Sequence, residues 1–98
     1  MKFFLIEIEY IVPIEKLDEV TPAHREFLQV QYDKGILLIS GPKVPRVGGM
    51  IIAKSSSQEE LQDLMKDDPF LKQNCAKYTY KEFAPVKYQP FLKDWLGI

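Results

Sequence analysis

The sequence predicts an α+β domain built in the order strand, helix, strand, strand, helix, strand. Three observations predict it. Residues 2–12 alternate with a period of two, apolar residues recur at spacings of three and four between Leu17 and Gln31, and two short apolar runs follow closely at 36–40 and 50–53. A chain of 98 residues has room for one core, so we expect a single domain over 1–98.

The first strand and the first helix each show one clear apolar face. In 2–12, one face carries Phe4, Ile6, Ile8, Tyr10 and Val12, and the other carries Phe3, Leu5, Glu7, Glu9 and Ile11. Pro13 ends the strand. The helix then runs as far as Lys34, with Gly35 as its expected stop. Glu7 and Glu9 lie on the strand face that this helix does not cover, where they could be pocket acids or partners of lysines.

The second half of the chain supplies the remaining elements. Ile36–Ser40 and Met50–Ala53 are apolar runs typical of strands, and Gly41-Pro42 between them reads as a turn. Serines 55–57 are candidate caps for a second helix, which buries Leu61, Leu64 and Met65. Alternating aromatic and charged residues predict a fourth strand over 78–86.

This order is the split βαβ, or ferredoxin-like, arrangement with a four-stranded antiparallel sheet. Two helices cover one face of such a sheet, yet the runs at 36–40 and 50–53 are apolar on both faces. We therefore expect a homodimer that packs sheet to sheet as a dimeric α+β barrel, rather than a monomer with an exposed apolar face. The apolar tail at 87–98 is expected to dock on the sheet or on the partner; the alternative is a flexible segment that another protein orders.

Composition narrows the classes of partner. A net charge of -1 and 46% hydrophobic residues argue against a disordered chain and against nucleic acid as a partner. No apolar stretch approaches the roughly 20 residues that span a bilayer, so no membrane association is expected. The lone Cys75 cannot form an intrachain disulfide and is expected to be a buried packing residue. These features predict a cytoplasmic protein.

His24 and Asp68 are the strongest candidates for chemistry. His24 lies four residues after Val20 and four before Leu28, which places it on the buried stripe of the first helix, where it needs a polar partner. Asp68 precedes Pro69, a pairing typical of a helix N-cap. A capping aspartate could also orient the imidazole, which would then act as a general acid or base. The alternative is a core histidine bonded to a backbone carbonyl.

The segment after the second strand offers candidate substrate-binding groups. Lys43 and Arg46 would suit an anionic group, although a solvated hairpin loop explains them equally well. Backbone amides near Gly41 could approach a ligand closely. No metal-ligand cluster or nucleotide-binding glycine motif appears, so chemistry without a cofactor is the simplest expectation.

The sequence resembles the YciI-like (YCII-related) proteins of the dimeric α+β barrel superfamily. The matching stretches are Pro22–Leu28, Gly35–Pro42 and Asp68–Phe70. The resemblance implies a ferredoxin-like protomer, a sheet-to-sheet dimer and a site in which His24 meets Asp68. Ser40, Gly41 and Pro42 join Lys43 and Arg46 as candidate substrate-binding residues. Asn74 stands where the family often has glycine, and asparagine also tolerates the left-handed conformation. The clearest activity in the family is dehydrochlorination.

Two functions are compatible with these features. The first is a small cofactor-independent lyase or isomerase that acts on a small organic acid by proton transfer or elimination. In this function His24 would move the proton, and Asp68 would orient the imidazole of His24. The second is a non-catalytic dimeric module that binds a small molecule.

Overall fold

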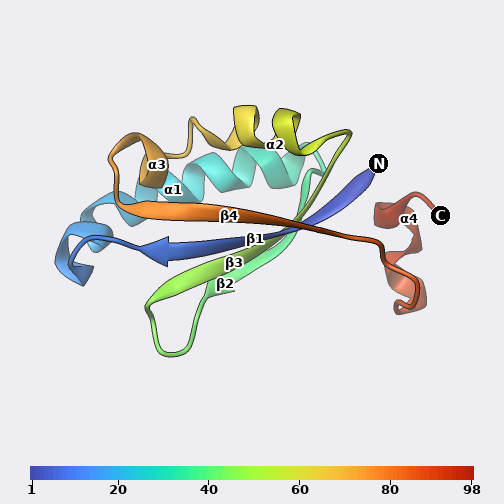
Figure 1. Ribbon diagram of the computed structural model, residues 1–98, viewed down its shortest axis with the longest axis horizontal. Helices are drawn as coiled ribbons and strands as arrows, with labels where there is room; N and C mark the ends of the chain where they lie inside the picture. Colours follow the sequence, from blue (N-terminus) through green and yellow to red (C-terminus); the bar gives the residue numbers. More distant parts are fainter.

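The computed structural model describes residues 1–98 and shows one four-stranded antiparallel sheet with helices on one side (Figure 1). The elements are β1 (Lys2–Tyr10), α1 (Ile14–Asp33), β2 (Leu37–Pro42), β3 (Gly48–Ser55), α2 (Gln58–Met65), α3 (Pro69–Lys72) and β4 (Ala76–Phe83), followed by a 3₁₀ turn, η1 (Pro90–Leu92), and α4 (Lys93–Leu96). The strand order is β2-β3-β1-β4. The predicted ferredoxin-like α+β arrangement is confirmed.

The core lies between the sheet and the helices α1, α2 and α3. Phe4, Ile6 and Ile8 of β1 face this layer and are buried, as the period of two predicts. Leu17, Val20 and Leu28 of α1 pack against them, with Leu61 and Met65 of α2. Cys75 is also buried in this cluster. Because α1 crosses this sheet face, any polar side chain on its apolar stripe is drawn out of water.

Several predicted boundaries were wrong. β1 ends at Tyr10 rather than at residue 12, and β4 covers Ala76–Phe83 rather than 78–86. Gly41 and Pro42 are not a turn: they extend β2 and pair with Met50 and Gly49. β2 is an edge strand, and an edge position tolerates the missing N–H of proline because its nitrogen can face solvent.

The helix ends follow local capping chemistry. Ser57 caps α2 by accepting a hydrogen bond from the Glu60 amide at 3.0 Å, as predicted. Gly35, just after α1, has a φ of 77°. Asn74 joins α3 to β4 with a φ of 54°, the left-handed conformation expected where the family often has glycine. None of the helices combines the length and the apolar character needed to cross a membrane.

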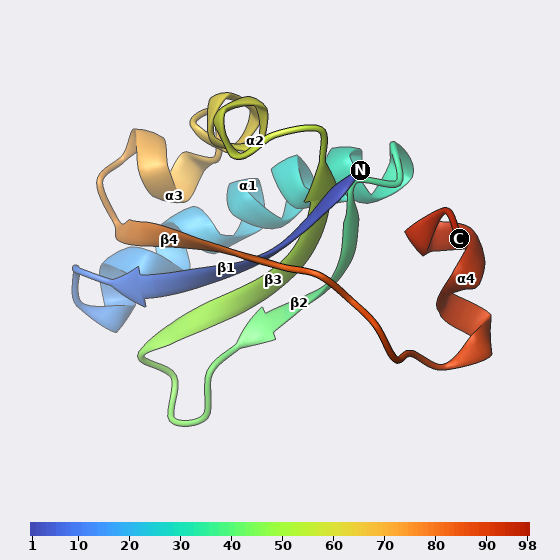
Figure 2. The same ribbon diagram turned by 45° about the vertical axis from the view of Figure 1, so that its right-hand side comes forward.

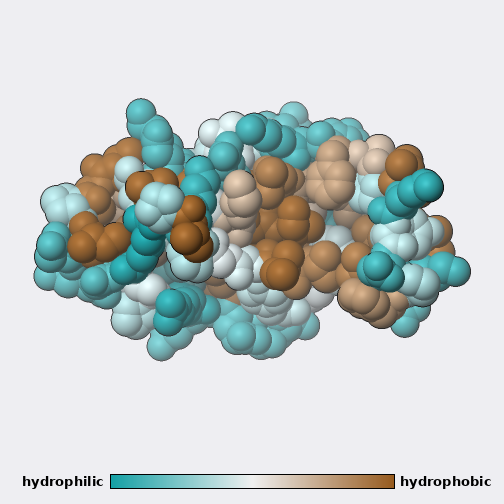
Figure 3. Space-filling view, turned by 90° about the horizontal axis from the view of Figure 1, so that it is seen from below, coloured by the Kyte–Doolittle hydropathy of each residue, from teal (hydrophilic) through white to brown (hydrophobic).

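The sheet face away from the helices stays open and carries an apolar patch. Figure 3 shows this patch from below, in the middle of the molecule. We call it the open face; its apolar residues are Leu5, Ile39, Met50, Ile52 and Phe83. Ile39 is 62% exposed and Phe83 is 45% exposed. Large side chains on this face therefore remain in contact with water in the single chain.

Glu7 lies on the open face between two lysines. Its carboxylate is 3.1 Å from the Lys81 ammonium and 3.2 Å from that of Lys43. The hydrogen bond from Lys81, and then that from Lys43, lowers the pKa of Glu7. Of the two interpretations left open for Glu7, the structure shows pairing with lysine.

The chain after β4 folds back to the end of the sheet where β1 begins (Figure 2). The Trp95 indole N–H donates to the Gly35 carbonyl at 2.9 Å, and its ring lies 5.7 Å from the ring of Phe3. The Lys54 ammonium lies 4.9 Å from the Trp95 ring centre and donates to the Trp95 carbonyl at 2.6 Å. Trp95 thus ties the tail to β1, β3 and the turn after α1.

Candidate active site

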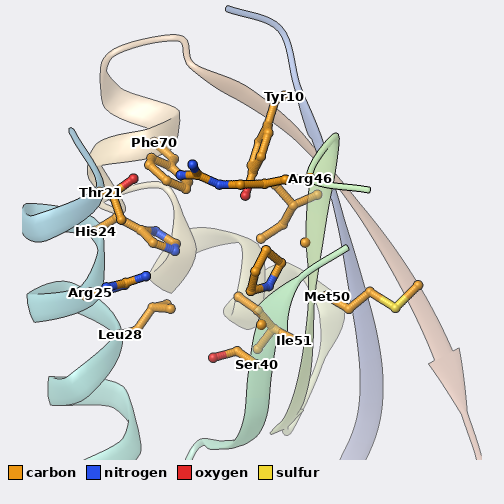
Figure 4. A pocket seen from close by; sticks show the side chains of 14 residues that line it. Tyr10, Thr21, His24, Arg25, Leu28, Ser40, Arg46, Met50, Ile51 and Phe70 are labelled. Carbon is orange, nitrogen blue, oxygen red and sulfur yellow. The ribbon is translucent and has the colours of Figure 1, made fainter. Parts of the chain in front are cut away.

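His24 faces a pocket between α1, β2 and β3 (Figure 4) and bonds to Asp68, which lies buried behind it. The Nδ1 atom of His24 lies 2.8 Å from Oδ1 and 3.0 Å from Oδ2 of Asp68. His24 is 8% exposed and Asp68 is fully buried. The two residues are 44 positions apart, and the packing of α1 against α3 brings them together.

Asp68 is held by more than the histidine. It caps α3, where its Oδ1 accepts from the Phe70 amide at 3.0 Å. Its Oδ2 accepts a hydrogen bond of 2.5 Å from the Tyr78 hydroxyl of β4. A buried carboxylate with three donors is compensated for the loss of hydration and is fixed in orientation.

These contacts define the tautomer of His24. An ionised carboxylate can only accept hydrogen bonds, so Nδ1 carries the hydrogen toward Asp68. In neutral His24, Nε2 then holds a lone pair, and no protein group bonds to it. The Phe70 ring stacks on the imidazole at 3.8 Å with an interplanar angle of 6°. His24 therefore presents an oriented base to the pocket.

Tyr78 is a member of this site that the sequence reasoning missed. Burial is the first cause that raises the pKa of its hydroxyl, and the charge of Asp68 is the second. Burial likewise raises the pKa of Tyr80 to about 12. Both hydroxyls therefore stay protonated in the folded protein well above the ordinary tyrosine value of 10.0.

We expect the free energy of unfolding to fall as the pH rises above about 10. The unfolded chain releases the Tyr78 proton near pH 10, while the folded chain keeps it, so the unfolded state binds fewer protons and gains in relative stability. Urea unfolding at pH 8 and pH 11 measures this slope. Tyr78→Phe should reduce this slope, leaving the part that Tyr80 contributes, and should cost about 1.5–3 kcal/mol at pH 8, the usual value of a hydrogen bond to a charged group. An unchanged slope in Tyr78→Phe would contradict the assignment.

The pocket has a volume of about 190 Å³. Its apolar wall includes Ile8, Leu28, Pro42, Ile51 and Phe70, and its polar side chains are Tyr10, Thr21, His24, Arg25, Ser40 and Arg46. Met50 lies at the rim with its side chain directed away (Figure 4). A small cavity with an apolar wall and a few polar groups is typical of a small-molecule site.

The structure places most of the sequence-predicted binding residues at this pocket. Ser40, Gly41, Pro42 and Arg46 line it. Lys43 does not: its ammonium lies on the open face beside Glu7. A side chain one residue further along an extended strand points to the opposite face, which separates Lys43 from Pro42.

Most of the polar lining groups already have partners. The Arg46 guanidinium is 2.7 Å from Asp18 of α1, and this hydrogen bond is the first cause that raises the pKa of Arg46. Ser40 shares a hydrogen bond of 2.6 Å with the Tyr32 hydroxyl, and Thr21 donates to the Leu17 carbonyl at 2.8 Å. No three His, Cys, Asp or Glu side chains form a metal-ligand group.

Sequence reasoning also missed Thr21, Arg25 and Phe70 as pocket residues. The signal for Thr21 was available, because it lies three residues before His24 and so on a nearby helix face. Phe70 could have been inferred as a neighbour of Asp68. Arg25 follows His24 directly, and neighbouring residues on a helix point about 100° apart, so nothing in the spacing brings both to one pocket.

Comparisons with known proteins agree with this architecture. A family model described as the YCII-related domain matches residues 1–84. Among solved structures, the chain is similar to 5-chloro-2-hydroxyhydroquinone dehydrochlorinase from Burkholderia phenoliruptrix AC1100, solved in complex with 2,5-dihydroxybenzoquinone. The TM-score is 0.73 at 18% identity, over 84% of this chain and 93% of that one, a likeness that shows a shared fold. No curated protein matches the sequence.

Proposed function

The chain belongs to the YCII-related domain family, and from its pocket we propose that it is a cofactor-independent enzyme that transfers protons to or from a small organic acid. The observation that carries the proposal is the contact of 2.8 Å between His24 and the buried Asp68 at the base of the pocket. The family match and the likeness to a dehydrochlorinase support a role in small-molecule chemistry.

In the proposed reaction, Nε2 of His24 takes a proton from carbon or from a hydroxyl group of the substrate. The resulting imidazolium is stabilised by the Asp68 carboxylate and by the stacked ring of Phe70. The electron pair left on the substrate has two outcomes. The proton can return at another carbon, which is an isomerisation. Alternatively, the pair forms a new double bond while a neighbouring chloride leaves with the electrons of the C–Cl bond; once His24 passes its proton to water, the net change is a loss of HCl.

The size of the pocket restricts the substrate. An apolar cavity of about 150 Å³ is large enough to hold benzene, so about 190 Å³ accommodates a single ring or a short chain with a few substituents. The stacked Phe70 and the side chains of Ile8 and Ile51 favour a flat, partly apolar body. We therefore propose a monocyclic or short unsaturated acid.

The test is a turnover assay that does not require the natural substrate. Candidate acids are incubated with the protein in D₂O, and deuterium at carbon is followed by NMR. In parallel, 5-chloro-2-hydroxyhydroquinone is incubated under nitrogen and chloride release is measured, with 2,5-dihydroxybenzoquinone as a binding probe. We expect deuterium incorporation or chloride release that is absent with His24→Gln. Ligands that bind without either reaction would overturn the proposal.

Binding without deuterium incorporation or chloride release would favour the second candidate function, a non-catalytic module that binds a small molecule. The observation that favours it is the dense bonding of the pair: Asp68 also caps α3 and accepts from Tyr78. Such contacts serve stability whether or not a reaction takes place. The module predicts saturable binding at the pocket with no change in the ligand.

We also propose that the protein is a homodimer joined through the open face. The apolar residues of this face would be covered by the same residues of a second copy, as in sheet-to-sheet packing. Ile39→Lys introduces a charge at an exposed position of β2 and should leave the protomer folded. We expect sedimentation velocity to show a dimer for the natural chain and a monomer for Ile39→Lys. A natural chain that is monomeric at micromolar concentration would contradict the proposal.

A further inference from the structure

One positively charged side chain at the pocket has no partner in the protein. Arg25 of α1 lines the pocket, and its guanidinium takes part in none of the ion pairs of the chain. Figure 4 shows it next to His24 on α1, at the edge of the pocket. Neighbouring residues on a helix point in different directions, but the arginine side chain is long enough to reach the same pocket as His24.

The other cations near the pocket, and two of its hydroxyl groups, are already engaged. Arg46 lies 2.7 Å from Asp18, so a substrate carboxylate there would have to displace Asp18 or lie against it. Lys43 is paired with Glu7 on the open face. The hydroxyls of Ser40 and Thr21 bond to Tyr32 and Leu17. The nitrogen groups at the pocket that no protein group engages are Nε2 of His24 and the guanidinium of Arg25; the Tyr10 hydroxyl, which also lines the pocket, carries no charge to pair with an anion.

The surroundings of the pocket favour a free cation for binding an acid. The buried Asp68 carboxyl has His24 as its one basic neighbour and no Lys or Arg within ion-pair distance, so an acidic ligand would bring a second carboxyl group close to it. Arg25 supplies the compensating positive charge at the same pocket. Its planar fork binds the two oxygens of a carboxylate in bidentate geometry.

We propose that Arg25 is the residue that selects the substrate, by binding a carboxylate of a small monocyclic or short-chain acid while another atom of that acid faces Nε2 of His24. This inference rests on the proposed function for the reacting partner but concerns binding alone. It replaces Lys43 and Arg46, the residues that the sequence indicated.

The test compares acids with their neutral amides of the same shape. The pairs are acetate and acetamide, crotonate and crotonamide, and benzoate and benzamide. Binding is followed by NMR through the ring protons of His24, which are unambiguous because the chain has one histidine. The variants are Arg25→Gln, Arg25→Lys and, as a control that removes the same charge away from the pocket, Lys43→Gln.

We expect at least one acid to bind the natural protein about tenfold more tightly than its amide, as charge-assisted hydrogen bonds allow. Arg25→Gln should remove this preference without changing the affinity for the amide, Arg25→Lys should retain part of it, and Lys43→Gln should retain all of it. The preference should also weaken in high salt, because the site is open to solvent.

In the binding experiment, three results would overturn the proposal: no acid preferred over its amide, a preference that survives Arg25→Gln, or an equal loss in Lys43→Gln. These outcomes are separate from failure of the proposed reaction. A preference for acids that depends on Arg25, without any turnover, would support the role of Arg25 in binding and contradict the proposed catalytic function. Turnover with an unchanged KM in Arg25→Gln would support the catalytic function and contradict the role of Arg25.

Discussion

Replacing His24 by glutamine is expected to lower turnover about a thousandfold while the protein remains folded. The glutamine amide can still donate a hydrogen bond to Asp68, but it has no basic nitrogen near neutral pH. General acid–base catalysis by a positioned side chain contributes about 10²- to 10⁴-fold. The measurement is the rate of deuterium incorporation or of chloride release with the substrate found for the natural protein.

Folding of this variant has to be shown separately. Trp95 is the one tryptophan in the chain, so its fluorescence reports the docking of the tail, and thermal unfolding reports the core. Both should match the natural protein closely, since the glutamine fills a similar volume beside Phe70. Turnover that persists in a folded His24→Gln protein would remove His24 from the mechanism.

Replacing Asp68 by alanine is expected to lower the free energy of unfolding by about 3–5 kcal/mol, because three buried donors lose their acceptor and each unsatisfied buried group costs about 1–3 kcal/mol. The change leaves the His24 Nδ1–H, the Phe70 amide and the Tyr78 hydroxyl without their acceptor. The lost contact with the Phe70 amide is the cap of α3, whose removal alone costs about 1 kcal/mol. Because small domains are stable by about 5–15 kcal/mol, urea unfolding should show a large shift of the midpoint.

Asp68→Asn is the matched control for this prediction. Its amide oxygen can still cap α3, but the uncharged group cannot stabilise an imidazolium at His24. We expect a smaller loss of stability than in Asp68→Ala together with a large loss of turnover, which separates the structural role of Asp68 from its chemical role. An Asp68→Ala protein that unfolds at the same urea concentration as the natural one would show that the three donors find other partners.

Local patterns predict the elements of this fold better than their ends. The period of two in β1 and the spacing in α1 are set by which side chains must leave water, and these are visible in the sequence. The end of β2 is not visible in the sequence, because Gly41-Pro42 is typical of a turn unless the strand is known to lie at the sheet edge. Strand ends depend on the neighbouring strand, which is distant in sequence.

Some residues of the candidate site can be predicted from local sequence patterns, and others cannot. A histidine on an apolar stripe needs a partner, and an Asp-Pro pair indicates a fixed carboxylate, so the sequence points to His24 and Asp68 individually. The hydrogen bond from Tyr78 to Asp68 and the position of Arg25 at the pocket have no local pattern. Lys43 and Arg46 are both cations in the same predicted loop, so the sequence does not distinguish them. In the structure, Lys43 pairs with Glu7 on the open face, whereas Arg46 pairs with Asp18 at the pocket.

The sequence alone therefore determined the order of the elements, the buried face of each, the two residues most suited to proton transfer and the resemblance to a family. The tertiary structure decided which donors surround Asp68, which cations are already paired and which one faces the pocket unpaired. The physical reason is that burial patterns act between neighbours along the chain, whereas hydrogen bonds and charge pairs form between side chains that only the packing of α1, α3 and the sheet brings within a few ångströms.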